Sequence, residues 1–133
     1  MPGLETMILC DTDVFIEALK NNPVTTNLLR KIGFENIALS SITLMELYFG
    51  ALNKREMLKI KKRMENLKIY KIDNYVSDTA LILIEKYSKS HGLCIPDALI
   101  ASTAIRKNVE LFTYNLKDFR FIKGINLFNN SVG

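Results

Sequence analysis

Short apolar runs alternate with helical segments along most of this chain, and that alternation restricts the fold more than any other feature. The predicted strands are residues 7–10, 37–39, 69–72 and 110–113, with residues 125–128 as a candidate fifth. These runs are largely continuous rather than alternating with polar residues, which is typical of a parallel sheet buried on both faces. The sequence therefore predicts an α/β fold, a three-layer α/β/α sandwich with a mostly parallel central sheet of four to five strands.

Helical periodicity and capping residues predict helices between the strands. Asp73 is the expected N-cap of the longest helix, which ends near Gly92, and Pro96 suits the first turn of the next helix. The predicted helices span residues 12–20, 24–32, about 41–52, 54–67, 74–90 and 96–105. In sheets of this kind, ligands bind beyond the carboxyl ends of the strands, so we expect a functional site there.

The length and the apolar pattern indicate one domain without a membrane segment. A chain of 133 residues has the size of a single domain, which we assign to residues 7–133. Residues 1–6 fit no element and are interpreted as a cloning remnant or an upstream start. The longest apolar stretch, residues 80–84, is far shorter than the roughly 20 residues that span a bilayer, and no signal peptide is visible. We therefore expect a cytoplasmic protein with no membrane partner.

Three acidic residues stand in the least polar parts of the sequence. Asp11 ends the first apolar run, Glu46 has apolar residues on both sides, and Asp97 precedes an apolar helix. Burying carboxylates near one another is costly, and no Lys or Arg lies beside them in the sequence. A bound divalent cation removes this cost, so the three residues predict a metal site. The two cysteines that precede Asp11 and Asp97 are expected to be small buried hydrophobes.

The positive charge of the chain is concentrated in the segment from Lys54 to Lys68. This segment holds seven basic and two acidic residues, so it carries +5 while the rest of the chain carries −1. A basic stripe of this kind indicates a polyanionic partner. A solvated helix face with Glu–Lys pairs accounts for the same pattern, and the sequence does not decide between the two.

Four segments, in the same order, resemble the four motifs of PIN-domain proteins. The first is a strand that ends in Asp followed by Thr, and the second is a helix with one inward Glu. The third is an Asp at the start of an apolar helix, and the fourth is a strand followed by a polar turn. The segments are Ile8–Ile16, Ser41–Gly50, Ile95–Ala101 and Leu111–Phe119, which together extend over nearly the whole chain.

This resemblance implies a metal-dependent endoribonuclease, similar in its compact form to the toxins of VapBC toxin–antitoxin pairs. It implies that Asp11, Glu46 and Asp97 are the catalytic residues and hold Mg²⁺ or Mn²⁺. The fourth motif departs from the family, in which an acidic residue is common at the position of Asn115. Asn115 supplies at most a neutral oxygen ligand, and whether Asn115 or the nearby Asp118 completes the site stays open.

Polar residues next to these acids complete the expected site. Thr12 and Thr113 could donate hydrogen bonds to the carboxylates and so orient them. Asp13 follows Thr12 directly and is interpreted as the cap of the first helix, with a place near the metal as the alternative.

The expected partners are RNA, an antitoxin and a second copy of the chain. Because bare carboxylates repel RNA phosphate, a separate basic surface that includes Lys61, Lys62 and Arg63 is expected to bind the RNA. Toxins of this type are usually homodimers that a small antitoxin neutralises, and Phe49 and Leu52 are candidate contact residues for such partners.

Two other functions stay open. The segment from Asp11 to Val14 also resembles the first motif of haloacid-dehalogenase-type phosphatases, in which the first Asp is the nucleophile. The later motifs of that family are not found, and a receiver domain is a poorer match still. The other alternative is a PIN-like module that binds RNA or protein without cleaving it, because Asn115 adds no negative charge.

Overall fold

The structure is a computed structural model that describes residues 7–129 of the chain. The interpretation of residues 1–6 and the last four residues of the expected domain lie outside the described residues. No helix in the described part is long and apolar enough to cross a membrane.

Parallel strands form the central sheet, in the order β3–β2–β1–β4. The central strand β1 pairs with β2 on one side and β4 on the other, so that Leu9 lies opposite both Ala38 and Leu111. The strands are β1 (Ile8–Cys10), β2 (Ile37–Ser40), β3 (Lys68–Tyr70) and β4 (Glu110–Phe112). Because they all run in one direction, their carboxyl ends lie at the same edge of the sheet.

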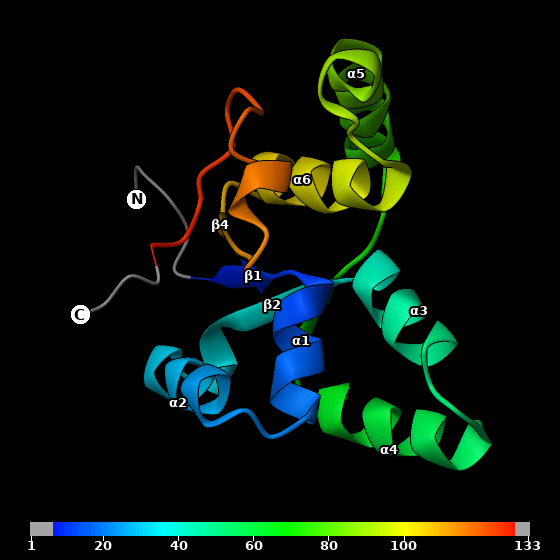
Figure 1. Ribbon diagram of the computed structural model, residues 1–133, viewed down its shortest axis with the longest axis vertical. Helices are drawn as coiled ribbons and strands as arrows, with labels where there is room; N and C mark the ends of the chain where they lie inside the picture. Colours follow the sequence, from blue (N-terminus) through cyan, green and yellow to red (C-terminus); the bar gives the residue numbers. More distant parts are fainter. Residues whose placement is uncertain (1–6, 130–133) are drawn as a thin grey trace.

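Helices cover both faces of the sheet, which gives three layers (Figure 1). The pair α5 and α6 lies on one side, and α1, α2 and α4 lie on the other, with α3 near the end of the sheet. The helices are α1 (Thr12–Leu19), α2 (Pro23–Ile32), α3 (Ser41–Phe49), α4 (Lys54–Met64), α5 (Asn74–His91) and α6 (Ile95–Lys107), with short 3₁₀ turns η1 (Phe34–Asn36) and η2 (Leu116–Asp118). The predicted α/β sandwich is confirmed.

The two faces of the sheet build two separate cores. Leu9 and Leu111 point to the side of α5 and α6, whereas Cys10 and Phe112 point to the side of α1 to α4, and all of them are fully buried. Successive strand residues face opposite sides, so a sheet that is covered on both faces must be apolar at every position. This is the physical reason for the continuous apolar runs in the sequence.

Several predicted element bounds differ from the structure, and the helix expected over about residues 41–52 ends at Phe49. Residues 125–128 make only an isolated parallel bridge between Leu127 and Leu111, flanked by a 2.8 Å hydrogen bond from Phe128 N to Leu111 O. The basic helix ends at Met64 rather than at residue 67, because β3 already begins at Lys68 and the chain must turn before it.

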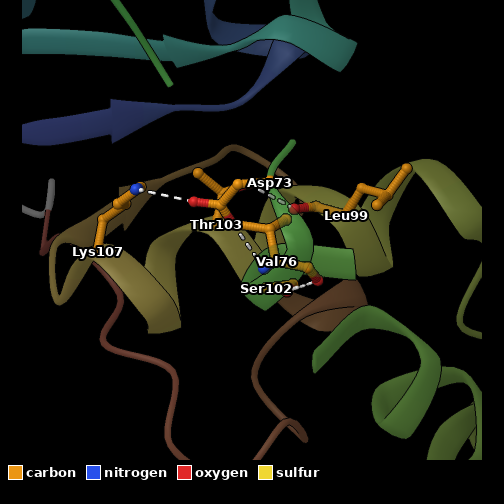
Figure 2. Close-up of polar contacts among 6 residues, drawn as sticks. All are labelled: Asp73, Val76, Leu99, Ser102, Thr103 and Lys107. Carbon is orange, nitrogen blue, oxygen red and sulfur yellow. Dashed lines mark hydrogen bonds and ion pairs between the residues drawn. The ribbon is translucent and has the colours of Figure 1, made fainter. Parts of the chain in front are cut away.

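The contact between α5 and α6 is held by satisfied polar groups, which Figure 2 shows. Asp73 is the N-cap of α5 and accepts a 2.9 Å hydrogen bond from Val76 N, and Lys107 of α6 lies 3.4 Å from its other oxygen. The hydroxyl of Ser102 donates a 2.5 Å hydrogen bond to the carbonyl of Val76. Small residues such as Ala101 and Ser102 are fully buried and let the two helices approach closely.

Candidate metal centre

Asp11 directly follows β1, an inner strand, and so lies at the carboxyl edge of the sheet. Its backbone N–H donates a 2.8 Å hydrogen bond to Phe112 O, which continues the pairing with β4. Its side chain is 5% exposed, caps α1 through Thr12 N at 2.8 Å, and accepts from the hydroxyl of Thr113 at 2.8 Å. Both carboxylate oxygens are therefore fixed in direction by hydrogen bonds.

Asp13 is not the cap of α1, and its interpretation as that cap is wrong. Asp11 takes the capping position, which leaves Asp13 half-buried in the first turn of the helix. Its Oδ2 accepts hydrogen bonds from Tyr114 N and Asn115 Nδ2, each at 3.1 Å. Its Oδ1 is buried and accepts no hydrogen bond within the described residues. The structure therefore places Asp13 beside Asp11, in agreement with the alternative drawn from the sequence, a position near the other acids.

Glu46 is held toward the other acids by two threonine hydroxyls. Thr12 Oγ1 lies 2.7 Å from Glu46 Oε1 and 3.0 Å from Thr43 Oγ1. A hydroxyl has one proton to donate, and the carboxylate is the nearer and stronger acceptor, so Thr12 donates to Glu46. Ser40 caps α3 and sets the start of the helix that carries Glu46. The half-buried Glu46 thus connects α3 to the first turn of α1.

Asp97 lies in the first turn of α6, half-buried and close to the same charges. The pKa of Asp97 is raised to about 6. Burial is the largest cause, the negative charge of Asp11 is the next, and the charges of Asp118 and Glu46 add smaller contributions. A hydrogen bond with the Cys94 side chain acts in the opposite direction and lowers it. Cys94 is exposed, so its expected burial is wrong, because it precedes α6 instead of lying inside it.

The pKa values of Asp11, Asp13 and Asp97 are raised mainly by burial, and neighbouring carboxylates add to each shift. Burial, followed by the charge of Asp11, raises the pKa of Asp13 to about 6. Burial also raises the pKa of Asp11, and the charge of Glu46 adds to the shift. The ion pairs among residues 7–129 join Glu17 to Lys20 and Asp73 to Lys107, so none of them involves a cluster acid.

The donor chemistry of the cluster suits a hard divalent cation. Carboxylate oxygens are the ligands that Mg²⁺ and Mn²⁺ prefer, and the unpartnered Asp13 Oδ1 is a buried acceptor in need of positive charge. As the side chains stand, no group of three or more Asp, Glu, His or Cys residues in the described part is arranged to hold a metal ion. Mg²⁺ commonly takes one or two carboxylates and keeps several waters, so it does not require such a group.

The remaining predicted site residues contact the acidic cluster in different ways. Asn115 turns its amide nitrogen to Asp13, and its backbone N–H donates to Thr113 Oγ1 at 3.0 Å. Asp118 is half-buried in η2 and acts on Asp97 through its charge. Thr12 and Thr113 bind the carboxylates directly, as described above.

The basic residues Lys61, Lys62 and Arg63 are exposed in the last turn of α4. Arg63 lines a hollow of about 520 Å³ between α1, α3 and α4, which Glu46 also lines. Lys61 and Lys62 do not line it, because α4 turns Ile60 and Met64 inward. Only part of the basic segment therefore shares a surface with the acids.

The family model described as PIN domain matches residues 8–124. The curated relative "tRNA(fMet)-specific endonuclease VapC" of Salmonella typhimurium is 27% identical over 124 residues, which cover 90% of this chain and 94% of the relative.

Solved structures of similar fold come from toxin–antitoxin complexes. VapBC2 of Rickettsia felis, bound to a DNA fragment from its promoter, superposes with a TM-score of 0.77 at 28% identity, covering 92% of this chain and 98% of the other. A toxin–antitoxin complex from Klebsiella pneumoniae gives 0.76 at 28% identity, covering 89% and 94%. DNA-bound VapBC from Salmonella typhimurium gives 0.78 at 24% identity, covering 92% and 96%, and supports the fold alone.

Proposed function

This chain belongs to the PIN-domain family, and on that premise we propose that it is a metal-dependent endoribonuclease, the toxin of a toxin–antitoxin pair that acts in the cytoplasm. The observation that carries the proposal is the uncompensated acidic cluster at the carboxyl edge of the sheet. Asp11, Glu46 and Asp97 come from three distant parts of the chain, and each acts electrostatically on another. A fold does not hold such charges together for stability alone.

The relatives support RNA as the substrate and an antitoxin as a partner. The curated relative is named as an endonuclease specific for one tRNA, and the solved relatives are toxin–antitoxin complexes. At 27% identity, this supports the substrate class rather than the same tRNA.

The proposed catalytic residues are Asp11, Glu46 and Asp97, which would hold Mg²⁺ or Mn²⁺. When bound, the ion activates water and stabilises negative charge on the phosphate and the leaving oxygen. Thr113 fixes one oxygen of Asp11, and Thr12 fixes one oxygen of Glu46, so both carboxylates are oriented before substrate arrives. The hydrogen bond from Thr113 also favours the charged form of Asp11 and so opposes the rise of its pKa on burial.

Three further residues have supporting roles in this proposal. Asp13 orders the turn after β4 by accepting hydrogen bonds from Tyr114 and Asn115. Asn115 would contribute through this contact rather than as a charged ligand. Asp118 adds negative charge near Asp97 and is the alternative candidate to complete the ion's surroundings.

The metal requirement is tested by RNA cleavage with and without divalent ions. The purified protein should cleave RNA in Mg²⁺ or Mn²⁺, and EDTA should abolish the activity. Asp11→Asn and Asp97→Asn should remove it, while Glu85→Gln, an exposed acid of α5, should leave it unchanged. Full activity of both site variants, or activity in EDTA, would reject the mechanism.

RNA binding through the basic segment is a separate part of the proposal. Lys61, Lys62 and Arg63 are exposed, and Arg63 shares a hollow with Glu46, so a strand that crosses α4 could reach the acids. Charge reversal of these three residues should weaken RNA binding and flatten its dependence on salt. Binding curves at several salt concentrations that match those of the unmodified protein would exclude this role.

The proposed protein partners are an antitoxin and a second copy of the chain. Phe49 and Leu52 are 93% and 85% exposed, which is unusual for large apolar side chains. Phe49 ends the helix that carries Glu46, and Leu52 follows it closely. Co-purification with the product of a neighbouring gene and loss of cleavage in that complex would support the antitoxin.

The alternatives have less support. The family match speaks against a haloacid-dehalogenase-type phosphatase, although Asp13 does lie beside Asp11. A PIN-like module that binds without cleaving predicts metal-independent RNA binding and no products, which the same cleavage assay detects.

A further inference from the structure

A second hollow, of about 570 Å³, opens directly beside the acidic cluster. Its wall includes Asp13 and Asn115, which belong to the edge of the candidate metal centre, and continues to Tyr114, Val24 and Glu17. The volume is within the range of roughly 300–1,000 Å³ that is usual for sites that bind small molecules. A ligand bound in this hollow would therefore lie next to the acidic cluster.

Tyr114 is a rigid aromatic surface in this wall. Its hydroxyl forms a 2.5 Å hydrogen bond with the buried Thr25, and its backbone N–H donates to Asp13. Its ring packs edge-on against Phe112, with the ring centroids 5.3 Å apart. The residue is nevertheless 38% exposed, so part of the ring is open to a ligand.

The charges around the hollow determine which part of a nucleotide fits. Asp13 and Glu17, which line the hollow, are both acidic. Glu17 forms an ion pair with Lys20, in which Lys20 Nζ lies 3.8 Å from Glu17 Oε2. A phosphate group would be repelled by these carboxylates, whereas a neutral flat ring would not. Val24, which is 66% exposed, adds apolar surface to the same wall. Aromatic surfaces without base-specific contacts bind nucleobases by stacking.

We propose that this hollow is a nucleobase subsite in which a base next to the scissile phosphate stacks on Tyr114. The inference rests on the proposed ribonuclease function, since the phosphate would lie at Asp11 and Asp97. It assigns to Tyr114 a role in positioning the RNA beside the acidic cluster. Val24 and Thr25 support the subsite from the start of α2.

The subsite is tested by binding of a fluorescent nucleotide, 2-aminopurine riboside 5′-monophosphate, in the presence of Mg²⁺. Stacking should quench its fluorescence, AMP should displace it, and ribose 5-phosphate should not. Tyr114→Leu should weaken binding by roughly 5- to 100-fold, the range expected for loss of one base–aromatic stack. Tyr75→Leu, which removes an exposed tyrosine from α5, is the matched control and should bind as the unmodified protein does.

A purely structural role of Tyr114 is separated by Tyr114→Phe. This variant keeps the ring and loses the hydroxyl bonded to Thr25, so stacking predicts nearly unchanged nucleotide binding. Equal loss of binding in the Phe and Leu variants, or none in the Leu variant, would overturn the subsite. If the unmodified protein cleaves RNA but Tyr114→Leu has the same KM, the subsite fails and the function stands. If nucleotide binding depends on Tyr114 but no RNA is cleaved, the proposed function fails and the subsite stands.

Discussion

The start of α5 and the carboxyl edge of the sheet shift the pKa values of their acidic residues in opposite directions. At the start of α5, the hydrogen bond from Val76 N and the nearby Lys107 lower the pKa of Asp73, so its ionised form is stabilised there (Figure 2). At the edge of the sheet, burial and neighbouring carboxylates raise the pKa of Asp11, Asp13 and Asp97.

This difference separates residues that stabilise the fold from residues that strain it. Asp73 and Ser102 complete hydrogen bonds that the two helices need. The cluster acids repel one another without an ion pair among the described residues, and such strain is expected at sites of chemistry. The comparison predicts that substitutions in the two regions have opposite effects on stability and activity.

The largest effect is expected from a matched pair of alanine substitutions, Asp97→Ala and Asp73→Ala. Asp97→Ala should lower RNA cleavage by roughly 10²–10³-fold, as for loss of one electrostatic group in a transition state, without lowering the melting temperature. Asp73→Ala should retain cleavage and lower the melting temperature by a few degrees, because α5 loses its cap. Cleavage assays and thermal unfolding of both variants measure the two effects. Similar profiles for the two variants would remove the distinction between the regions.

A smaller effect is expected from the hydroxyls in each region. Thr12→Val removes the donor that orients Glu46 and should lower cleavage by about 10- to 100-fold, whereas Thr12→Ser should restore most of it. Ser102→Ala should lower only the melting temperature, because its hydroxyl bonds the backbone of α5. Cleavage rates of the three variants at saturating Mg²⁺ provide the measurement. An active Thr12→Val variant would mean that Glu46 needs no orientation by Thr12.

The smallest effect concerns stability as a function of pH without divalent ions. Asp13 and Asp97 have a pKa of about 6 in the folded protein against 3.8 for the free group, so the folded state binds their protons more tightly. Their protonation favours folding fully below pH 3.8, and this contribution is lost as the pH rises through 6. The loss should be of the order of 1 kcal/mol, because solvent reaches these half-buried groups.

Chemical denaturation between pH 4 and pH 7 measures this loss, and Asp97→Asn should reduce the slope. Mg²⁺ or Mn²⁺ should restore stability mainly above pH 6, where the carboxylates are charged. Stability that rises over this pH range in the absence of metal would contradict the repulsion within the cluster.

Local signals in the sequence were sufficient to predict the helices and strands and to single out three of the clustered acids. Asp73 and Gly92 correctly marked the ends of α5, and the apolar surroundings of Asp11, Glu46 and Asp97 drew attention to the acids that the fold brings near each other. Helix caps and apolar surroundings both depend on residues that are adjacent in the chain, so they can be read from the sequence.

The errors concern features that depend on contacts between distant segments. Asp13 resembled a helix cap because it follows Thr12, but β4 ends where Tyr114 and Asn115 can donate to it. Residues 125–128 have the composition of a strand, yet they form a single bridge, between Leu127 and Leu111, rather than a ladder. Nothing in the local sequence shows that Tyr114 bonds Thr25 across 89 positions, so the hollow between them could not be predicted.

Binding of Mn²⁺ at pH 7.5, measured by titration calorimetry or by electron paramagnetic resonance, tests most directly whether the distant acids share one cation. The unmodified protein and Asp73→Asn should bind Mn²⁺ with the same affinity. Asp11→Asn and Asp97→Asn, which alter β1 and α6 separately, should each weaken binding by about tenfold or more. Unchanged affinity in both of these variants would show that the two carboxylates do not act on a common ion.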